Sequence, residues 1–195
     1  MKIGKGATKF ASLTFFLLFL ATIFYLLPLA LTQSDEKYTV STANVTKHVA
    51  IAMSNNLTAG IIFGDVNTGT TNNNATGNFN STGHTQYWIT IDGTTNVDVD
   101  LCIRVNQPLT SGSYQIPNTN YHYSFDDDTN DWTHPAFPPT TDISETYQKT
   151  VEDKWVGGVS DEIYFRFALD VPSNTHAGEY SNYVYFKAVE NTTLC

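Results

Sequence analysis

Positively charged residues are scarce in this chain, which holds 10 Lys and Arg against 19 Asp and Glu in 195 residues. Three of the 10, Lys2, Lys5 and Lys9, stand near the N-terminus, and all acidic residues follow residue 33. The chain after residue 33 therefore has 7 basic and 19 acidic side chains. Nucleic-acid binding needs clustered Lys and Arg that displace counterions from phosphates. This charge balance excludes nucleic-acid partners and favours divalent cations and sugars.

Catalytic signatures are also missing. The five histidines are scattered, and neither a His-Glu-x-x-His helix nor a paired-Cys zinc spacing occurs. No Gly-x-Ser-x-Gly nucleophile elbow occurs either. In GDVNTGTT, Gly64 and Gly69 have the spacing of a phosphate loop, but Thr70 replaces the lysine and no helical pattern follows. We therefore expect no enzyme, and we interpret this stretch as a turn.

Only two cysteines occur, Cys102 and Cys195, so the chain is not a disulfide-dense scaffold. An even number in an exported chain allows one disulfide in an oxidising compartment. The alternative is that both thiols are free, because Cys195 is the last residue and a chain end frays easily.

The long apolar run lies at the N-terminus, where residues 10–32 carry no charge and follow a basic start. This pattern predicts a secretory signal peptide at 1–32, or a membrane anchor if the segment is retained. Lys5-Gly6 also resembles the processing site of type IV pilin-like proteins, in which the apolar helix stays in the filament. Against that alternative, the glutamate usual early in such a helix is replaced by Ala11.

After residue 33 no long stretch has helical periodicity, and residues typical of strands and turns dominate. The segment 96–105 alternates strictly, with Val99, Leu101 and Ile103 on one face and Asp100 and Cys102 on the other. It predicts a half-buried strand that carries Cys102 on its outer face.

Further strands are predicted at 47–53, 59–64, 86–92, 161–171 and 182–190, with weaker ones at 38–43 and 121–125. Seven or eight strands between Gly, Pro and Asn turns predict an all-β, two-sheet sandwich over 46–195, with a closed barrel as the alternative. Long loops are expected at 67–85 and 106–147.

Asn-x-Ser/Thr sequons occur at five positions: Asn44, Asn56, Asn74, Asn80 and Asn191. Two of them fall in the loop 67–85, whose Asn, Thr, Gly and Ser content predicts exposure. We expect several to carry N-glycans. Trp88, Trp132 and Trp155 are candidates for a sugar-binding aromatic platform, although core packing and cross-strand pairing explain most of the aromatics more simply.

The run FDDDTNDW places Asp126, Asp128 and Asn130 at alternate positions, which is the oxygen-ligand pattern of a calcium loop. The pattern is incomplete, because no glycine stands at the sixth position and Phe137 replaces the glutamate at the twelfth. The alternatives are a solvated acidic turn, or a calcium ion bound with help from distant oxygens.

Several segments together resemble one family. After a secretory signal come NLTAGIIFGDVNTGTT, a Tyr-Trp strand, TTNVDVDLCIRVNQPLTSG and PSNTHAGEYSNYVYF. Their order, with GIIFGDVNTG and VDLCI, resembles the archaeal bundling pilins, which are related to the TasA and camelysin-like biofilm fibre proteins. The likeness covers most of the mature chain.

The resemblance implies a secreted, jelly-roll-like sandwich that polymerises by donor-strand complementation, in which the N-terminal segment of one subunit enters a groove in the next. The candidate donor is 33–45, with Tyr38, Val40 and Thr42 on one face; the alternative is an ordinary first strand or a ragged terminus. The camelysin branch also suggests a metalloprotease, for which the chain has no zinc motif.

The expected function is therefore that of a structural subunit of an extracellular filament. Its expected partners are identical subunits, and neighbouring filaments bundled through polar, glycan-bearing loops. The contrasting hypothesis is a secreted or membrane-anchored module that binds calcium or carbohydrate as a monomer.

Overall fold

The computed structural model describes residues 37, 39–127 and 135–195. Val45–Cys195 forms one compact unit. Residues 37 and 39–44 belong to a separate N-terminal unit and are exposed, without helix or strand. The expected signal peptide at 1–32 lies outside the described residues. Across the described ranges, no helix is long and apolar enough to cross a membrane.

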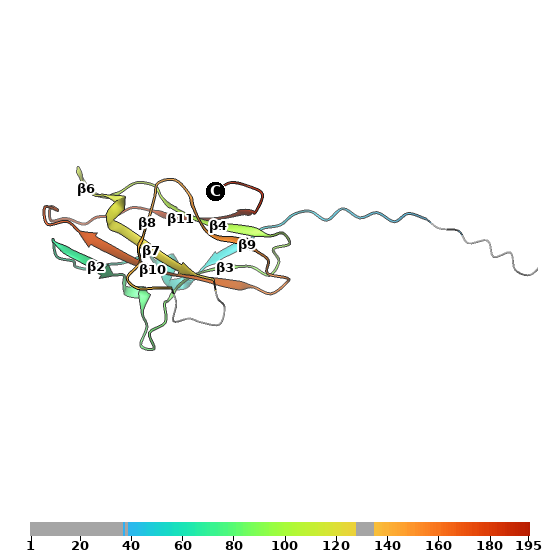
Figure 1. Cartoon of the computed structure of the whole chain (residues 1–195), viewed down its shortest axis with the longest axis horizontal. Helices are drawn as coiled ribbons and strands as arrows, with labels where there is room; N and C mark the ends of the chain where they lie inside the picture. The colour runs from blue at the N-terminus through green and yellow to red at the C-terminus, as the bar shows by residue number, and fades with distance from the viewer. Residues whose placement is uncertain (1–36, 38, 128–134) are drawn as a thin grey trace, which may run out of the picture. The chain divides into compact units, whose positions relative to one another are not determined.

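Residues 45–195 form an all-β sandwich of two main antiparallel sheets, as the strand pattern predicts (Figure 1). The larger sheet has the strand order β1-β3-β10-β7-β8, and β2 also pairs with β10. Its strands are β1 Ile51–Met53, β2 Thr70–Asn74, β3 Tyr87–Ile91, β7 Tyr121–Asp126, β8 Thr141–Asp142 and β10 Asp161–Val171. The long central strand β10 thus holds the sheet together.

The smaller sheet has the order β11-β4-β9, with β4 Val99–Val105 between β9 Gln148–Lys154 and β11 Val184–Glu190. A separate hairpin consists of β5 Leu109–Ser111 and β6 Tyr114–Ile116. The described helices are short: α2 Asn55–Ala59 and the 3-10 helices η1 Thr76–Asn78 and η2 Asn118–Asn120.

The core lies between the two sheets. Leu101 and Ile103 of β4 are fully buried, as the alternation predicts, and so are Phe165 and Phe167 of β10. The rings of Phe165 and Phe186 meet edge to face across the sheets, with centroids 5.2 Å apart. Burial of these apolar side chains is the main favourable term that holds the two sheets together.

Three predicted strands are much shorter or absent. Residues 39–43 of the weaker predicted strand 38–43 form no strand. The segment 47–53 forms a strand only at β1. The segment 59–64 forms no strand, because Ala59 ends α2 and the glycines at 60 and 64 leave the extended conformation. The side chain of Ser54 caps α2 by accepting a hydrogen bond from Leu57 N at 3.2 Å. Gly60 and Gly64 then take φ values of 114° and 67°, which favour glycine.

The predicted long loops contain regular structure. The segment 67–85 includes β2 and η1, and 106–147 includes β5, β6, β8 and η2 besides the predicted strand β7. The stretch GDVNTGTT is a turn that leads into β2, with Gly69 N donating to Val171 O at 2.7 Å. Polar, short strands of this kind carry no apolar alternation, which explains why the pattern misses them.

The second face of β4 is buried as well, so the expected half-buried strand is covered on both sides. Asp100 and Cys102 point away from the core, yet they are 1% and 0% exposed. Cys102 is bonded to Cys195, 93 positions later, and Lys149 Nζ lies 2.8 Å from Asp100 Oδ2. The C-terminal residues therefore act as a lid over the middle of the smaller sheet.

Candidate functional site

Strand β11 is an open edge of the smaller sheet. It pairs with β4 in an unbroken antiparallel register from Val184 opposite Val105 to Glu190 opposite Val99. Among the described strands, none pairs with its other side. A regular edge strand of seven residues presents a row of backbone groups to any incoming strand.

The alternation of backbone hydrogen bonds along β11 shows which residues direct their backbone groups toward the open side. Asn106 N donates to Tyr183 O, and Asn191 N donates to Asp98 O, each at 3.0 Å. Val105 N instead donates to Ser144 O, away from β11. Because hydrogen-bonded pairs alternate along an antiparallel ladder, the backbone N–H and C=O groups of four residues point outward: Val184, Phe186, Ala188 and Glu190.

The first three of these residues also turn their side chains toward the core. Val184, Phe186 and Ala188 pack against it but stay partly exposed, whereas Ile103, which pairs with Phe186, is fully buried. Unpaired backbone groups and uncovered apolar surface therefore coincide at one edge. An added strand would satisfy the first and bury the second.

The other edge strands that the structure describes are protected against pairing with an added strand. Strands β1 and β8 have three and two residues, and β2 is wholly polar with a register shift beside it. Strand β9 is as long as β11, but its pairing with β4 shifts register twice and Asp153 has a φ of 52°. Bulges, charges and short length are the usual protection against edge pairing. Strand β11 is neither short nor bulged, and of its two charged residues, Lys187 and Glu190, Lys187 is drawn back over the sheet by the bond from its Nζ to Cys195 O.

The expected donor segment is only partly described. Val40 and Thr42 are exposed and lie in a stretch without helix or strand, with Val40 at 78% exposure. Tyr38 lies outside the described residues. Further along, residues 45–49 are also exposed, and Val45 reaches 77%. Val40 and Val45 are thus exposed valines outside any described strand, while residues 46–48 are bonded to Asn96 and Glu190.

The five sequons differ in how they present the asparagine. Asn44, Asn74 and Asn80 are exposed, while Asn56 and Asn191 are partly buried. Asn191 Nδ2, the atom that a glycan would join, donates to Asp153 Oδ1. Asn74 Oδ1 accepts from Asn78 Nδ2 at 2.5 Å. Asn80 is exposed and also lines a pocket.

The expected calcium loop begins at Asp126, which ends β7, while Asp128 and Asn130 lie outside the described residues. Asp127 Oδ2 lies 3.7 Å from Lys154 Nζ, and the same ammonium group lies 2.8 Å from Asp161 Oδ2. A lysine here competes with a cation for Asp127. In the described part of the chain, no group of three or more His, Cys, Asp and Glu is arranged to hold a metal.

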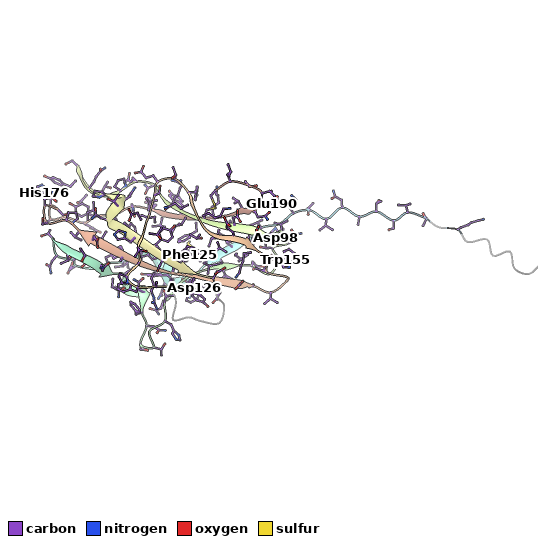
Figure 2. The ribbon with its side chains drawn as sticks, in the orientation of Figure 1. Asp98, Phe125, Asp126, Trp155, His176 and Glu190 are labelled. Atoms are coloured by element: carbon purple, nitrogen blue, oxygen red, sulfur yellow. A yellow bond between two sulfur atoms is a disulfide. The ribbon has the colours of Figure 1, made fainter. Side chains whose placement is uncertain are left out.

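Two tryptophans line pockets. The Trp88 pocket, of about 290 Å³, is formed by Asn80, Gln86, Trp88, Glu162 and Tyr164 with adjoining residues of the same loop. The Trp155 pocket, of about 510 Å³, includes Asp98, Trp155, Glu190 and Asn191 at one end of the sandwich (Figure 2). Trp132 lies outside the described residues. The sequence marks both tryptophans and both sequons, but only the fold places each tryptophan beside a sequon asparagine.

Comparison with protein-family models, with curated proteins and with solved structures finds no match for this chain.

Proposed function

We propose that this chain is an exported, glycosylated structural subunit of an extracellular filament, akin to the bundling pilins that its sequence resembles. In this proposal the N-terminal segment of one subunit adds as a strand beside β11 of the next. The observation that carries it is the open edge of β11, where outward backbone groups and partly exposed Val184, Phe186 and Ala188 coincide.

Strand addition at this edge is energetically favourable in two ways. Each new backbone hydrogen bond contributes about 0.5–1.5 kcal/mol net. The apolar area covered adds about 25 cal/mol per Å². A donor strand as long as β11 makes such hydrogen bonds and covers apolar area along seven positions. Since the donor and the acceptor are different surfaces, the contact is head to tail and need not close into a ring.

The surface chemistry suits a role outside the cell. The described unit contains a disulfide, which oxidising compartments maintain, and three of the sequon asparagines are exposed. The excess of acidic residues keeps filaments apart unless polar loops or glycans connect them. We propose these loops as the contacts through which filaments bundle. No catalytic step is part of this function.

The test is deletion of residues 33–43 in the full mature chain. The truncated protein should be monomeric by light scattering and should show no fibres by electron microscopy, while the intact protein polymerises. A synthetic peptide of residues 33–45 added to the truncated protein should bind, and a scrambled peptide of the same composition should not. Fibres formed by the truncated protein would rule out donation from this segment.

A monomeric carbohydrate-binding module is the second candidate, and the Trp88 pocket favours it. That function predicts no polymer at any concentration of the intact chain, together with binding of a free saccharide measured by calorimetry. Polymer formation by the intact chain, lost on deletion of residues 33–43, separates the two candidates.

A further inference from the structure

The Trp88 pocket lies on the face of the larger sheet that points away from the core. Trp88 of β3 pairs with Tyr164 of β10 in the sheet register, and their ring centroids are 6.3 Å apart. Their neighbours Tyr87, Ile89 and Phe165 point the other way and are buried in the core. The pair therefore forms an aromatic floor on the outer surface, with Trp88 partly exposed.

Polar groups surround this aromatic floor. Tyr164 donates its hydroxyl hydrogen to Glu162 Oε2 at 2.5 Å, which fixes the carboxylate at the wall of the pocket. Gln86, which immediately precedes β3, adds an amide. A sugar ring has an apolar C–H face and hydroxyl groups around its rim. An aromatic ring below and a carboxylate and amide beside it match both features.

Asn80 lies at the rim of the same pocket and is the asparagine of a sequon. Its Oδ1 accepts hydrogen bonds from Thr82 N at 2.9 Å, Thr82 Oγ1 at 2.7 Å and His84 N at 3.0 Å. These bonds occupy the oxygen and hold the side chain in one orientation. No described residue accepts a hydrogen bond from Asn80 Nδ2, the atom that a glycan would join, in contrast to Asn191 Nδ2, which is bonded to Asp153.

The loop that carries Asn80 is fastened to the sheet. Asn80 N donates to His84 O at 2.8 Å, and Gly83 N donates to Asn80 O at 3.0 Å. Arg166 of β10 reaches over the Phe79 ring, 4.2 Å from its centroid, and donates to Gly83 O at 2.9 Å. The distance between the sequon and the aromatic floor is therefore set by the fold.

We propose that the N-glycan attached to Asn80 folds back over the sheet, so that its first sugars lie on Trp88 within this pocket. The volume of about 290 Å³ is at the small end of ligand sites, which span roughly 300–1,000 Å³. It therefore accepts one or two sugar rings, while the rest of the glycan extends into solvent. This assignment does not depend on filament assembly and is measured on the monomer.

The experiment compares the indole N–H resonances of Trp88 and Trp155 by NMR in protein made in a glycosylating host, truncated at residue 43 to keep it monomeric. Thr82→Ala removes the sequon but keeps Asn80 and its backbone bonds, and Asn191→Gln is the matched control at the other tryptophan. We expect Asn80 to be occupied in glycopeptide mass spectrometry. Thr82→Ala should shift the Trp88 resonance and leave that of Trp155 in place.

Two further outcomes decide the assignment. Trp88→Ala, with the Asn80 glycan intact, should sharpen the resonances of the first sugars, because they lose their contact and move freely. An unoccupied Asn80, or a Trp88 resonance unchanged by Thr82→Ala, overturns the proposal. So does a Trp88 resonance that is the same with and without the Asn80 glycan and shifts only when free saccharide is added.

Discussion

The side-chain amide of Asn78 pairs with the backbone of Phe167 through two hydrogen bonds. Asn78 Nδ2 donates to Phe167 O at 2.6 Å, and Phe167 N donates to Asn78 Oδ1 at 2.8 Å. This pair sits where the neighbour of β10 changes from β3, whose first residue lies opposite Phe165, to β2, whose last residue lies opposite Ala168. One side chain thus fills a gap in the sheet that a strand residue would otherwise fill.

We expect Asn78→Ala to destabilise the protein by about 2–4 kcal/mol. Asn78 is fully buried, and its loss leaves Phe167 N without a partner in the core, which alone costs about 1–3 kcal/mol. The measurement is the free energy of unfolding from urea titration. Asn182→Ala serves as control, because Asn182 is partly exposed and its side chain makes one hydrogen bond, to Gln107 O, so its loss should cost under about 1 kcal/mol. Equal losses in both variants would contradict this role for Asn78.

Removal of the disulfide should cost about 2–5 kcal/mol. Cys102 and Cys195 close a loop of 93 positions, and cross-linking so long a loop strongly restricts the unfolded chain. The expected result is a lower melting temperature in the presence of reductant. The double variant Cys102→Ala, Cys195→Ala should match the reduced protein and should not respond to reductant. A melting temperature that is insensitive to reductant in the parent protein would show that the bond adds nothing.

A proline at one position of β11 should prevent filament assembly and leave folding intact. Ala188→Pro removes a backbone N–H that faces the open edge, so the monomer keeps its ladder with β4. We expect this variant to fold and not to polymerise. Val189→Pro is the matched control, because its N–H belongs to the ladder with Asp100, and we expect a loss of about 3 kcal/mol or more. Normal fibres from the Ala188→Pro protein would show that β11 is not the acceptor.

Stability should fall at alkaline pH because of buried tyrosines. Burial raises the pKa of Tyr121 above its ordinary value of 10.0, and Tyr87 raises it further. Burial also raises the pKa of Tyr164, with the hydrogen bond to Glu162 as the second cause. Because the pKa of each of these tyrosines is higher in the folded state than in the unfolded state, its contribution to stability is fully present below pH 10.0. That contribution is lost as the pH rises toward the pKa of the folded state.

The measurement is urea unfolding between about pH 8 and pH 11, across the range where tyrosine in the unfolded chain ionises. The unfolded state binds fewer protons there, so the free energy of unfolding should decrease. Tyr121→Phe should flatten this dependence. A free energy of unfolding that stays constant to pH 11 would contradict the proposed burial of the two phenols.

Strands with strict apolar alternation could be predicted from sequence, and polar ones could not. Strand β10 has the predicted bounds, and the inner face of β4 is as expected, because burial on one face imposes a period of two residues. Strand β2 consists of TTNNN and carries no such period. It is held by tertiary bonds instead, such as Asn73 Nδ2 donating to Leu169 O at 2.7 Å.

The candidate sites were less accessible to sequence reasoning. The pattern predicts β11 as a strand, but whether a strand is central or at an edge depends on sheet order, which no local pattern contains. In the same way, Asn80 is recognisable as a sequon, while its nearness to Tyr164 depends on the pairing of β3 with β10. The burial of Cys102 also comes from a contact 93 positions away.

The disulfide has a mechanical consequence for the edge strand β11. Lys187 in the middle of β11 pairs with Cys102, and five residues beyond the end of β11 the chain is bonded back to Cys102 through Cys195. A pull on β11 from its C-terminal end therefore cannot peel it from β4 one hydrogen bond at a time, because the covalent link takes the load first. The load passes through Cys195 into Cys102 of β4, so the ladder between β11 and β4 is not pulled apart from this end while the bond is intact.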